Sequence, residues 1–116
     1  MSKLLNLLPA ALFLSACGNT SSTDNTPVTA GYSSINSVIF QSKCLSCHSS
    51  DNLGGGVDVS TYNSLMASGV VVAGNPSGSR LYSALSTGTM PKGGSQLSTA
   101  QLQAISDWIT AGAANN

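Results

Sequence analysis

The segment Cys44-Leu45-Ser46-Cys47-His48 constrains this 116-residue chain more than any other feature. It places two thiols three residues apart, with a histidine directly after the second. Residues i and i+3 of a helical turn face the same side, so both thiols can reach one ligand. Two such thiols followed by histidine are the attachment pattern for c-type haem. We therefore expect one haem c, joined by thioethers to Cys44 and Cys47, with the imidazole of His48 as an axial ligand of the iron.

Two other interpretations of this segment remain to be weighed, a thiol–disulfide redox pair and half of a structural zinc site. A redox pair would sit more naturally at the end of a strand in a βαβ pattern, which the sequence lacks. A zinc site would need further cysteine or histidine ligands. Cys17 is the one other cysteine and His48 is the one histidine. The pattern therefore favours haem attachment.

The beginning of the chain has the pattern of a secretory signal. Lys3 supplies a positive charge, and Leu4–Ala16 form an apolar stretch of thirteen residues. A bilayer span needs about 20 apolar residues, so this stretch fits a signal sequence instead. Its end, Leu14-Ser15-Ala16-Cys17, resembles the bacterial lipoprotein cleavage box. That resemblance implies cleavage before Cys17 and a diacylglycerol on its sulfur; an ordinary secretory signal or a free cysteine are the alternatives.

We expect three parts in the chain. Residues 1–16 form the signal peptide, residues 17–31 the lipidated cysteine with a flexible tether, and residues 32–116 the folded domain. The tether is rich in Ser, Thr and Asn, and so cannot bury enough apolar surface to offset chain entropy. Gly18 follows the cysteine, which resembles outer-membrane rather than inner-membrane lipoproteins. The expected location is the periplasmic side, lipid-anchored, at the outer membrane.

Charged residues are sparse in the expected domain. Its basic residues are Lys43, Arg80 and Lys92, and the whole chain has no glutamate. With no basic cluster, we expect no nucleic-acid partner. A domain of about eighty residues buries only about 60% of its unfolded surface. We therefore expect the haem to supply part of the core.

Apolar spacing predicts helices over residues 34–43, 60–68, 75–86 and 98–111. Ser98 and Gln101 are placed for a capping box at the start of the last helix, and Gly112 for its end. In the first helix, Phe40 stands four residues before Cys44, on the same face. The first and last helices each have an apolar face without another partner, so we expect them to pack across each other. The predicted fold class is all-α, with three to five helices wrapped around one covalent haem.

A loop over residues 87–94 carries the candidate for the second axial ligand, Met90. A thioether is a soft ligand for haem iron, and a His/Met pair raises the reduction potential. Met66 is the competitor, but it lies inside a helical pattern and fits core packing better. Arg80 and Trp108 are candidates for contact with the haem propionates.

The motifs together resemble a class I monohaem cytochrome c domain. The resemblance rests on Phe40–His48, on Met90-Pro91 and on a final helix containing Trp108-Ile109. It implies a cytochrome c-like fold, one-electron transfer and four haem-binding residues: Cys44, Cys47, proximal His48 and distal Met90. The ring of lysines that many soluble cytochromes use for docking is absent from this chain, which puts that mode of partner recognition in doubt.

The expected function is a membrane-tethered periplasmic electron carrier, not an enzyme, with redox proteins as partners and the membrane reached through Cys17. The alternative is a haem enzyme, or a sensor of peroxide or gas, in which Met90 is displaced. The sequence offers no distal histidine or acid–base pair for that chemistry, since His48 is already used. A structural or thiol-redox protein without haem is the third possibility.

Overall fold

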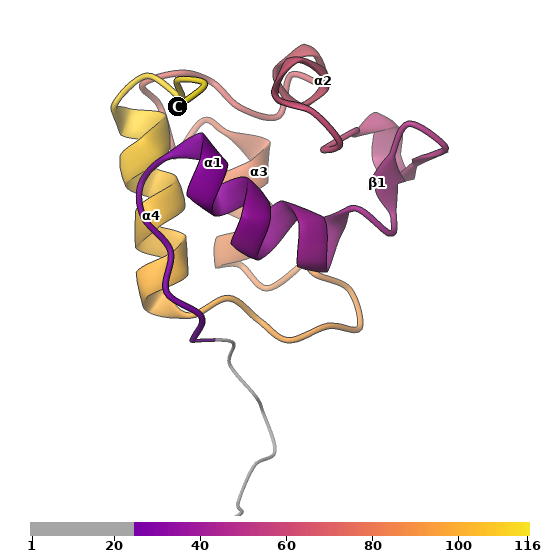
Figure 1. The fold of residues 1–116 in the computed structure, drawn as a ribbon, viewed down its shortest axis with the longest axis horizontal. Coiled ribbons are helices and arrows are strands. Elements are labelled where there is room, and N and C mark those ends of the chain that lie inside the picture. Colours follow the sequence, from indigo (N-terminus) through magenta and orange to yellow (C-terminus); the bar gives the residue numbers. More distant parts are fainter. Residues whose placement is uncertain (1–24) are drawn as a thin grey trace, which may run out of the picture.

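The computed structural model describes residues 25–116 (Figure 1). Its elements, in chain order, are α1 (Tyr32–Ile35), the π-helix η1 (Asn36–Cys44), strands β1 (His48–Ser49) and β2 (Asn52–Leu53), the 3₁₀ turn η2 (Gly54–Gly56), and helices α2 (Tyr62–Ala67), α3 (Arg80–Ser86) and α4 (Thr99–Thr110). The described chain is thus helix-rich with one small antiparallel sheet, which the expected all-α class did not include.

Two expectations fall on residues that the structure does not describe. The signal peptide, 1–16, and the lipidation site, Cys17, lie outside residues 25–116. Within the described range, no helix combines the length and the apolar character that crossing a membrane requires.

The first helix begins as an α-helix and continues as a π-helix, where the sequence predicted one α-helix over 34–43. The Ser37 and Ser42 hydroxyls each donate to the backbone carbonyl four residues earlier, a bond that loosens helical winding. The Gln41 side chain donates to the Asn36 side chain at 3.2 Å, across the five-residue spacing that a π-helix brings together. Side-chain bonds therefore accompany the wider winding that leads into Cys44.

The beginning of α1 is completed by the far end of the chain. The Tyr32 N–H donates to the Asn116 Oδ1 at 3.0 Å, and the Ser33 N–H donates to the Asn116 backbone oxygen at 2.7 Å. These bonds satisfy two of the N–H groups that the first turn of any helix leaves without a partner in the helix itself.

Both ends of α4 are as the sequence predicted. The Ser98 hydroxyl accepts from the Gln101 N–H at 3.1 Å, and the Gln101 side chain accepts from the Ser98 N–H at 3.1 Å. At the other end, the Gly112 N–H donates to the Ile109 carbonyl and the Ala113 N–H to the Trp108 carbonyl. This is a Schellman motif, with Gly112 at a φ of +113°.

The two middle helices begin later than predicted. Thr61 rather than Ser60 caps α2, because its side chain accepts from the Ser64 N–H at 3.1 Å. The backbone N–H of Ser60 donates instead to Asp58. Helix α3 begins at Arg80 and not near residue 75. Ser79 stands before it in an extended conformation, with its side chain buried.

Helices α1 and α4 contact each other, as expected (Figure 1). The ring centroids of Tyr32 and Trp108 lie 6.0 Å apart, and those of Tyr32 and Phe40 lie 6.3 Å apart. Around these rings, buried side chains from every α-helix and from the connecting segments form one cluster. The protein side chains thus form a continuous core, which includes the wholly buried Phe40.

The described part of the expected tether, residues 25–31, packs against the domain. The Gln101 side chain, wholly buried in α4, donates to the Thr26 carbonyl at 2.9 Å. The Thr29 N–H donates to the Ser34 hydroxyl at 2.9 Å, and Val28 packs against the core. Contacts of this segment with the domain therefore begin at Thr26, six residues before the expected boundary at Tyr32.

Candidate haem-binding site

The two thiols and the histidine lie where the first helix gives way to the small sheet. Cys44 is the last residue of η1 and is half-buried, whereas Cys47 is exposed in the turn that follows. The Cys47 N–H donates to the Cys44 carbonyl at 3.2 Å, which closes this turn. His48 is the first residue of β1. The two thiols and the histidine therefore lie on one turn that connects the end of η1 to the start of β1.

The His48 ring is held by backbone groups of the segment that follows it. Its Nδ1 lies 3.3 Å from the Val57 carbonyl oxygen, and its own carbonyl accepts from the Val59 N–H at 2.8 Å. With the Nδ1 proton donated to Val57, the lone pair is on Nε2, the atom that would bind a metal. The structure thus identifies the Val57 carbonyl as the partner that orients the His48 ring.

The Cys44 thiol has the wrong environment for a redox nucleophile. Burial raises its pKa to about 11, and the nearby Cys47 adds to the rise, while Lys43 acts in the opposite direction. Its place at the end of η1 also opposes a thiolate, because the negative end of the helix dipole lies there. Cysteines that act as nucleophiles have a lowered pKa instead. A thiol-redox pair beginning at Cys44 is therefore disfavoured.

A structural zinc site finds no support in the described residues. Residues 25–116 contain no group of three or more His, Cys, Asp or Glu side chains that could hold a metal ion. Cys44, Cys47 and His48 do not assemble into a closed ligand set, as a structural zinc site requires.

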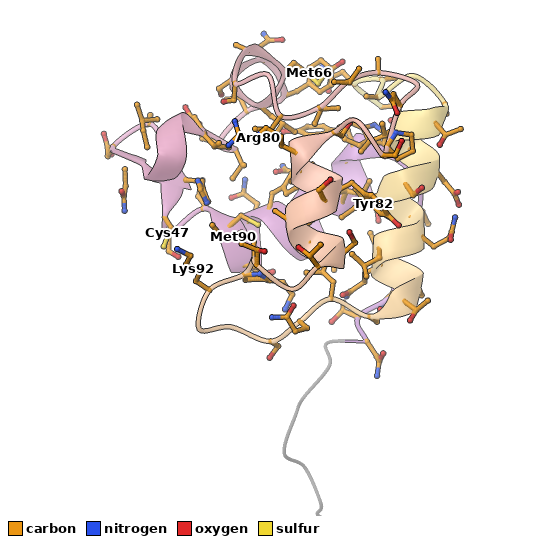
Figure 2. The ribbon with its side chains drawn as sticks, turned by 180° about the vertical axis from the view of Figure 1, so that it is seen from behind. Cys47, Met66, Arg80, Tyr82, Met90 and Lys92 are labelled. Atoms are coloured by element: carbon orange, nitrogen blue, oxygen red, sulfur yellow. The ribbon has the colours of Figure 1, made fainter. Side chains whose placement is uncertain are left out.

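Met90 lies in the loop after α3 (Figure 2), and the residues that follow it in this loop, 91–95, line a groove together with Ser46 of the thiol-bearing turn. Its backbone N–H donates to the Ala84 carbonyl at 3.0 Å, and its half-buried side chain packs against the core. The groove has a volume of about 240 Å³. Ser46, next to Cys47, lines one side of it, and Pro91, next to Met90, lines the other. The structure thus brings the loop and the thiol-bearing turn together.

The other candidates named from the sequence lie elsewhere. Met66 is on α2, far from Cys47 in Figure 2, and packs against the core. The Trp108 indole N–H donates to the Ala114 carbonyl at 2.8 Å, and this buried side chain is part of the core. Arg80 is exposed at the start of α3. Met90 is therefore the better placed of the two methionines.

The donor set and its surroundings fit a haem. Thiols are the groups that form thioethers, while imidazole and thioether sulfur are both established axial ligands of haem iron. The His48 ring is already oriented through Nδ1, and the side chain of Cys44 is next to the core. The role of Val57 was not predicted from the sequence; the run of glycines at residues 54–56, just before it, was the available signal.

The fold and the site together define a small helical domain with the ligand types of a haem protein. Residues 44–94 match the family model described as planctomycete cytochrome C. This match begins at Cys44, the first thiol of the motif, and ends in the loop that carries Met90. It supports a c-type cytochrome-like domain. Comparison with curated proteins and with solved structures finds no match.

Proposed function

We propose that this chain is a one-electron carrier that holds one covalently attached haem c with His48 and Met90 as axial ligands. One observation carries the proposal: the CxxCH turn, its histidine already bonded to Val57 through Nδ1, faces the Met90 loop across a single groove. The match to a cytochrome c family supports a haem-binding electron carrier. We propose further that the domain is of the class I monohaem type.

Each ligand residue has a separate task in this proposal. Cys44 and Cys47 would hold the cofactor covalently, and His48 would bind the iron through Nε2. Met90 would supply the second axial ligand from the loop. When bound, the haem supplies the reversible one-electron change. The protein keeps both axial groups in place, so that little rearrangement accompanies a change of oxidation state.

The proposed setting is the periplasmic side of the outer membrane. Cys17 would be lipidated after cleavage of residues 1–16, because Leu14–Cys17 resemble a lipoprotein cleavage box. Multiple acyl chains anchor a protein stably, whereas a single chain does so only marginally. Redox proteins at the membrane would be the partners, and we propose no catalytic activity for the chain.

The first test is the visible spectrum of protein exported and matured in a bacterial periplasm. The pyridine adduct should show a haem with two thioether bonds, and mass spectrometry should show a single covalently added haem. A folded, mature protein without colour contradicts the proposal.

The second test compares Met90→Ala with Met66→Ala. Loss of the Met90 thioether should lower the reduction potential and open the iron to added ligands, because sulfur favours the reduced form. Met66→Ala serves as the matched control and should leave both properties unchanged. An unchanged spectrum and potential in Met90→Ala would show that Met90 is not a ligand. Rapid carbon monoxide binding by the native reduced protein would instead favour a sensor or enzyme in which Met90 is displaced.

A further inference from the structure

Gly54 lies against the edge of the His48 imidazole. A methyl group on its Cα would be 2.6 Å from the Cys47 carbonyl oxygen. The same methyl would be 3.2 Å from Cε1 and 3.3 Å from Nδ1 of His48. The first distance is far inside van der Waals contact, and it is to backbone, which cannot rotate away. A side chain at residue 54 is therefore excluded by space.

The neighbouring glycines have a different role. Gly55 and Gly56 have φ values of +63° and +77°, and a methyl group on either would meet nothing within 4 Å. They allow the backbone to turn, since a left-handed conformation favours glycine. Gly54 is not among the residues with positive φ. The first glycine of the run is thus required by close approach, and the next two by conformation.

Gly54 is hydrogen-bonded both to the residue before His48 and to the residue whose carbonyl holds the His48 ring. The Gly54 N–H donates to the Cys47 carbonyl at 2.9 Å, and the Gly54 carbonyl accepts from the Val57 N–H at 3.2 Å. The Val57 carbonyl is the partner of His48 Nδ1. Gly54 therefore connects the residue before the histidine to the residue that orients its ring.

We propose that Gly54 is a positioning residue that sets the rotation of the His48 ring by allowing the 54–57 backbone to lie against its Nδ1 edge. A methyl group at this place must push the turn away from the ring, or rotate the ring away from Val57. Either response weakens the Nδ1 bond and changes the direction of Nε2. This inference rests on the proposed function, because it assigns Gly54 a role toward the axial ligand.

The test compares Gly54→Ala with wild type and with Gly31→Ala, all as mature haem proteins. Gly31 is a suitable control because its φ is −136° and an added methyl would be 3.6 Å from Asn116, an ordinary contact. Electron paramagnetic resonance of the oxidised protein reports the orientation of the imidazole plane. We expect the g values and the reduction potential to shift in Gly54→Ala and to stay at wild-type values in Gly31→Ala.

Unchanged g values and potential in Gly54→Ala overturn the inference. A second measurement needs no variant and therefore holds even if Gly54→Ala fails to fold. In the reduced wild-type protein, a strong nuclear Overhauser effect should connect the Gly54 Hα protons to His48 Hε1, and its absence also overturns the inference. Failure of the proposed function is distinguishable, because the wild-type protein would then contain no haem.

Discussion

At the scale of single residues, the buried polar side chains are all bonded. In the described range 25–116, no buried side-chain nitrogen or oxygen lacks a hydrogen-bond partner. Ser79 is the clearest case, since it is wholly buried just before α3. Its hydroxyl donates to the Asn75 carbonyl at 2.8 Å and accepts from the Val72 N–H at 2.8 Å. The Ser79 side chain thus holds residues 72–79 in a non-helical conformation, and α3 begins only at Arg80.

Ser79→Ala should therefore destabilise the protein. The substitution removes the part-buried hydrogen bond that the Val72 N–H donates to Ser79, a loss of about 1 kcal/mol. Chemical denaturation followed by circular dichroism measures the effect. Ser83→Ala on the exposed face of α3 is the control and should change the free energy of unfolding by no more than about 0.5 kcal/mol. Equal stability of the two variants would contradict this account of Ser79.

Asp58 gives a pH-dependent prediction at the same scale. Hydrogen bonds from Ser60, including its backbone N–H at 2.9 Å, lower the pKa of the Asp58 carboxyl below 3.8. A carboxyl with a lowered folded pKa adds stability above its unfolded pKa, and this contribution is lost as the pH falls through the folded value. Unfolding measured from pH 5 downward should therefore show a smaller acid-induced loss of stability in Asp58→Asn than in wild type. If the free energy of unfolding fell equally with pH in the two proteins, Asp58 would not contribute to the acid-induced loss of stability.

At the scale of elements, the sequence predicted best where local chemistry decides. The capping box at Ser98 and the stop at Gly112 depend on residues within a few positions of one another, and both are confirmed. The start of α3 depends instead on the burial of Ser79 and on its bond to Val72, seven residues earlier, and burial cannot be read from a helix-start pattern. The same holds for Asn116, which caps α1 from the other end of the described chain.

The candidate site follows the same division. The spacing of Cys44, Cys47 and His48 was readable because one helical turn determines which side chains face together. The bond between His48 and the Val57 carbonyl was not predicted, because loop backbone paths depend on the whole fold. The π winding of η1 was not predicted, since the four-residue spacing of Ile35 and Ile39 also fits an α-helix.

The capping box allows a prediction for α4. Ser98→Ala removes the hydroxyl that accepts from the Gln101 N–H at 3.1 Å, and should cost about 1 kcal/mol of stability. Ser98→Asp keeps an acceptor at this position and should restore most of the loss, with added benefit from a negative charge at the helix start. Thermal unfolding of the two variants is the measurement. A stable Ser98→Ala protein would mean that tertiary packing alone holds this end of the helix.

At the scale of the whole molecule, two positively charged side chains lie beside the candidate site. Lys43 and Lys92 both line the groove between the thiol-bearing turn and the Met90 loop, whereas Arg80 lies apart from them at the start of α3 (Figure 2). No acidic residue lines the groove. Although the chain has no net charge, an anionic partner therefore meets a locally positive surface here.

Lys92→Gln should accordingly slow electron exchange with a small anionic oxidant. One charge at a separation of about 10 Å in water contributes about 0.4 kcal/mol, roughly twofold in rate for each charge on the reagent. Arg80→Gln removes the same charge away from the groove and is the matched control. Stopped-flow rates at low and high salt measure the effect, which salt should reduce. Equal rates for the two variants would place electron exchange elsewhere on the surface.

The attachment of residues 25–31 to α4 determines where the chain leaves the domain. Gln101 serves both the capping box, through Oε1, and Thr26, through Nε2. Gln101→Glu keeps the acceptor for Ser98 but removes the donor to Thr26, so it separates these two roles. Loss of this hydrogen bond costs about 1 kcal/mol, and a buried carboxylate opposite the Thr26 carbonyl adds to that cost, so amide exchange at Thr29 should speed up by roughly fivefold or more. Any anchor upstream would then hold the domain through a longer unattached segment.

Gln103→Glu is the control for this prediction, because it adds the same charge on the exposed face of the same helix. It breaks only a bond within α4, from Gln103 to Asp107, and should leave exchange at Thr29 unchanged. Hydrogen exchange measured by NMR distinguishes the two variants residue by residue. If Thr29 exchanges at the wild-type rate in Gln101→Glu, Val28 packing and the Ser34 bond hold the segment by themselves. The chain would then leave the domain at the same place without any contribution from Gln101.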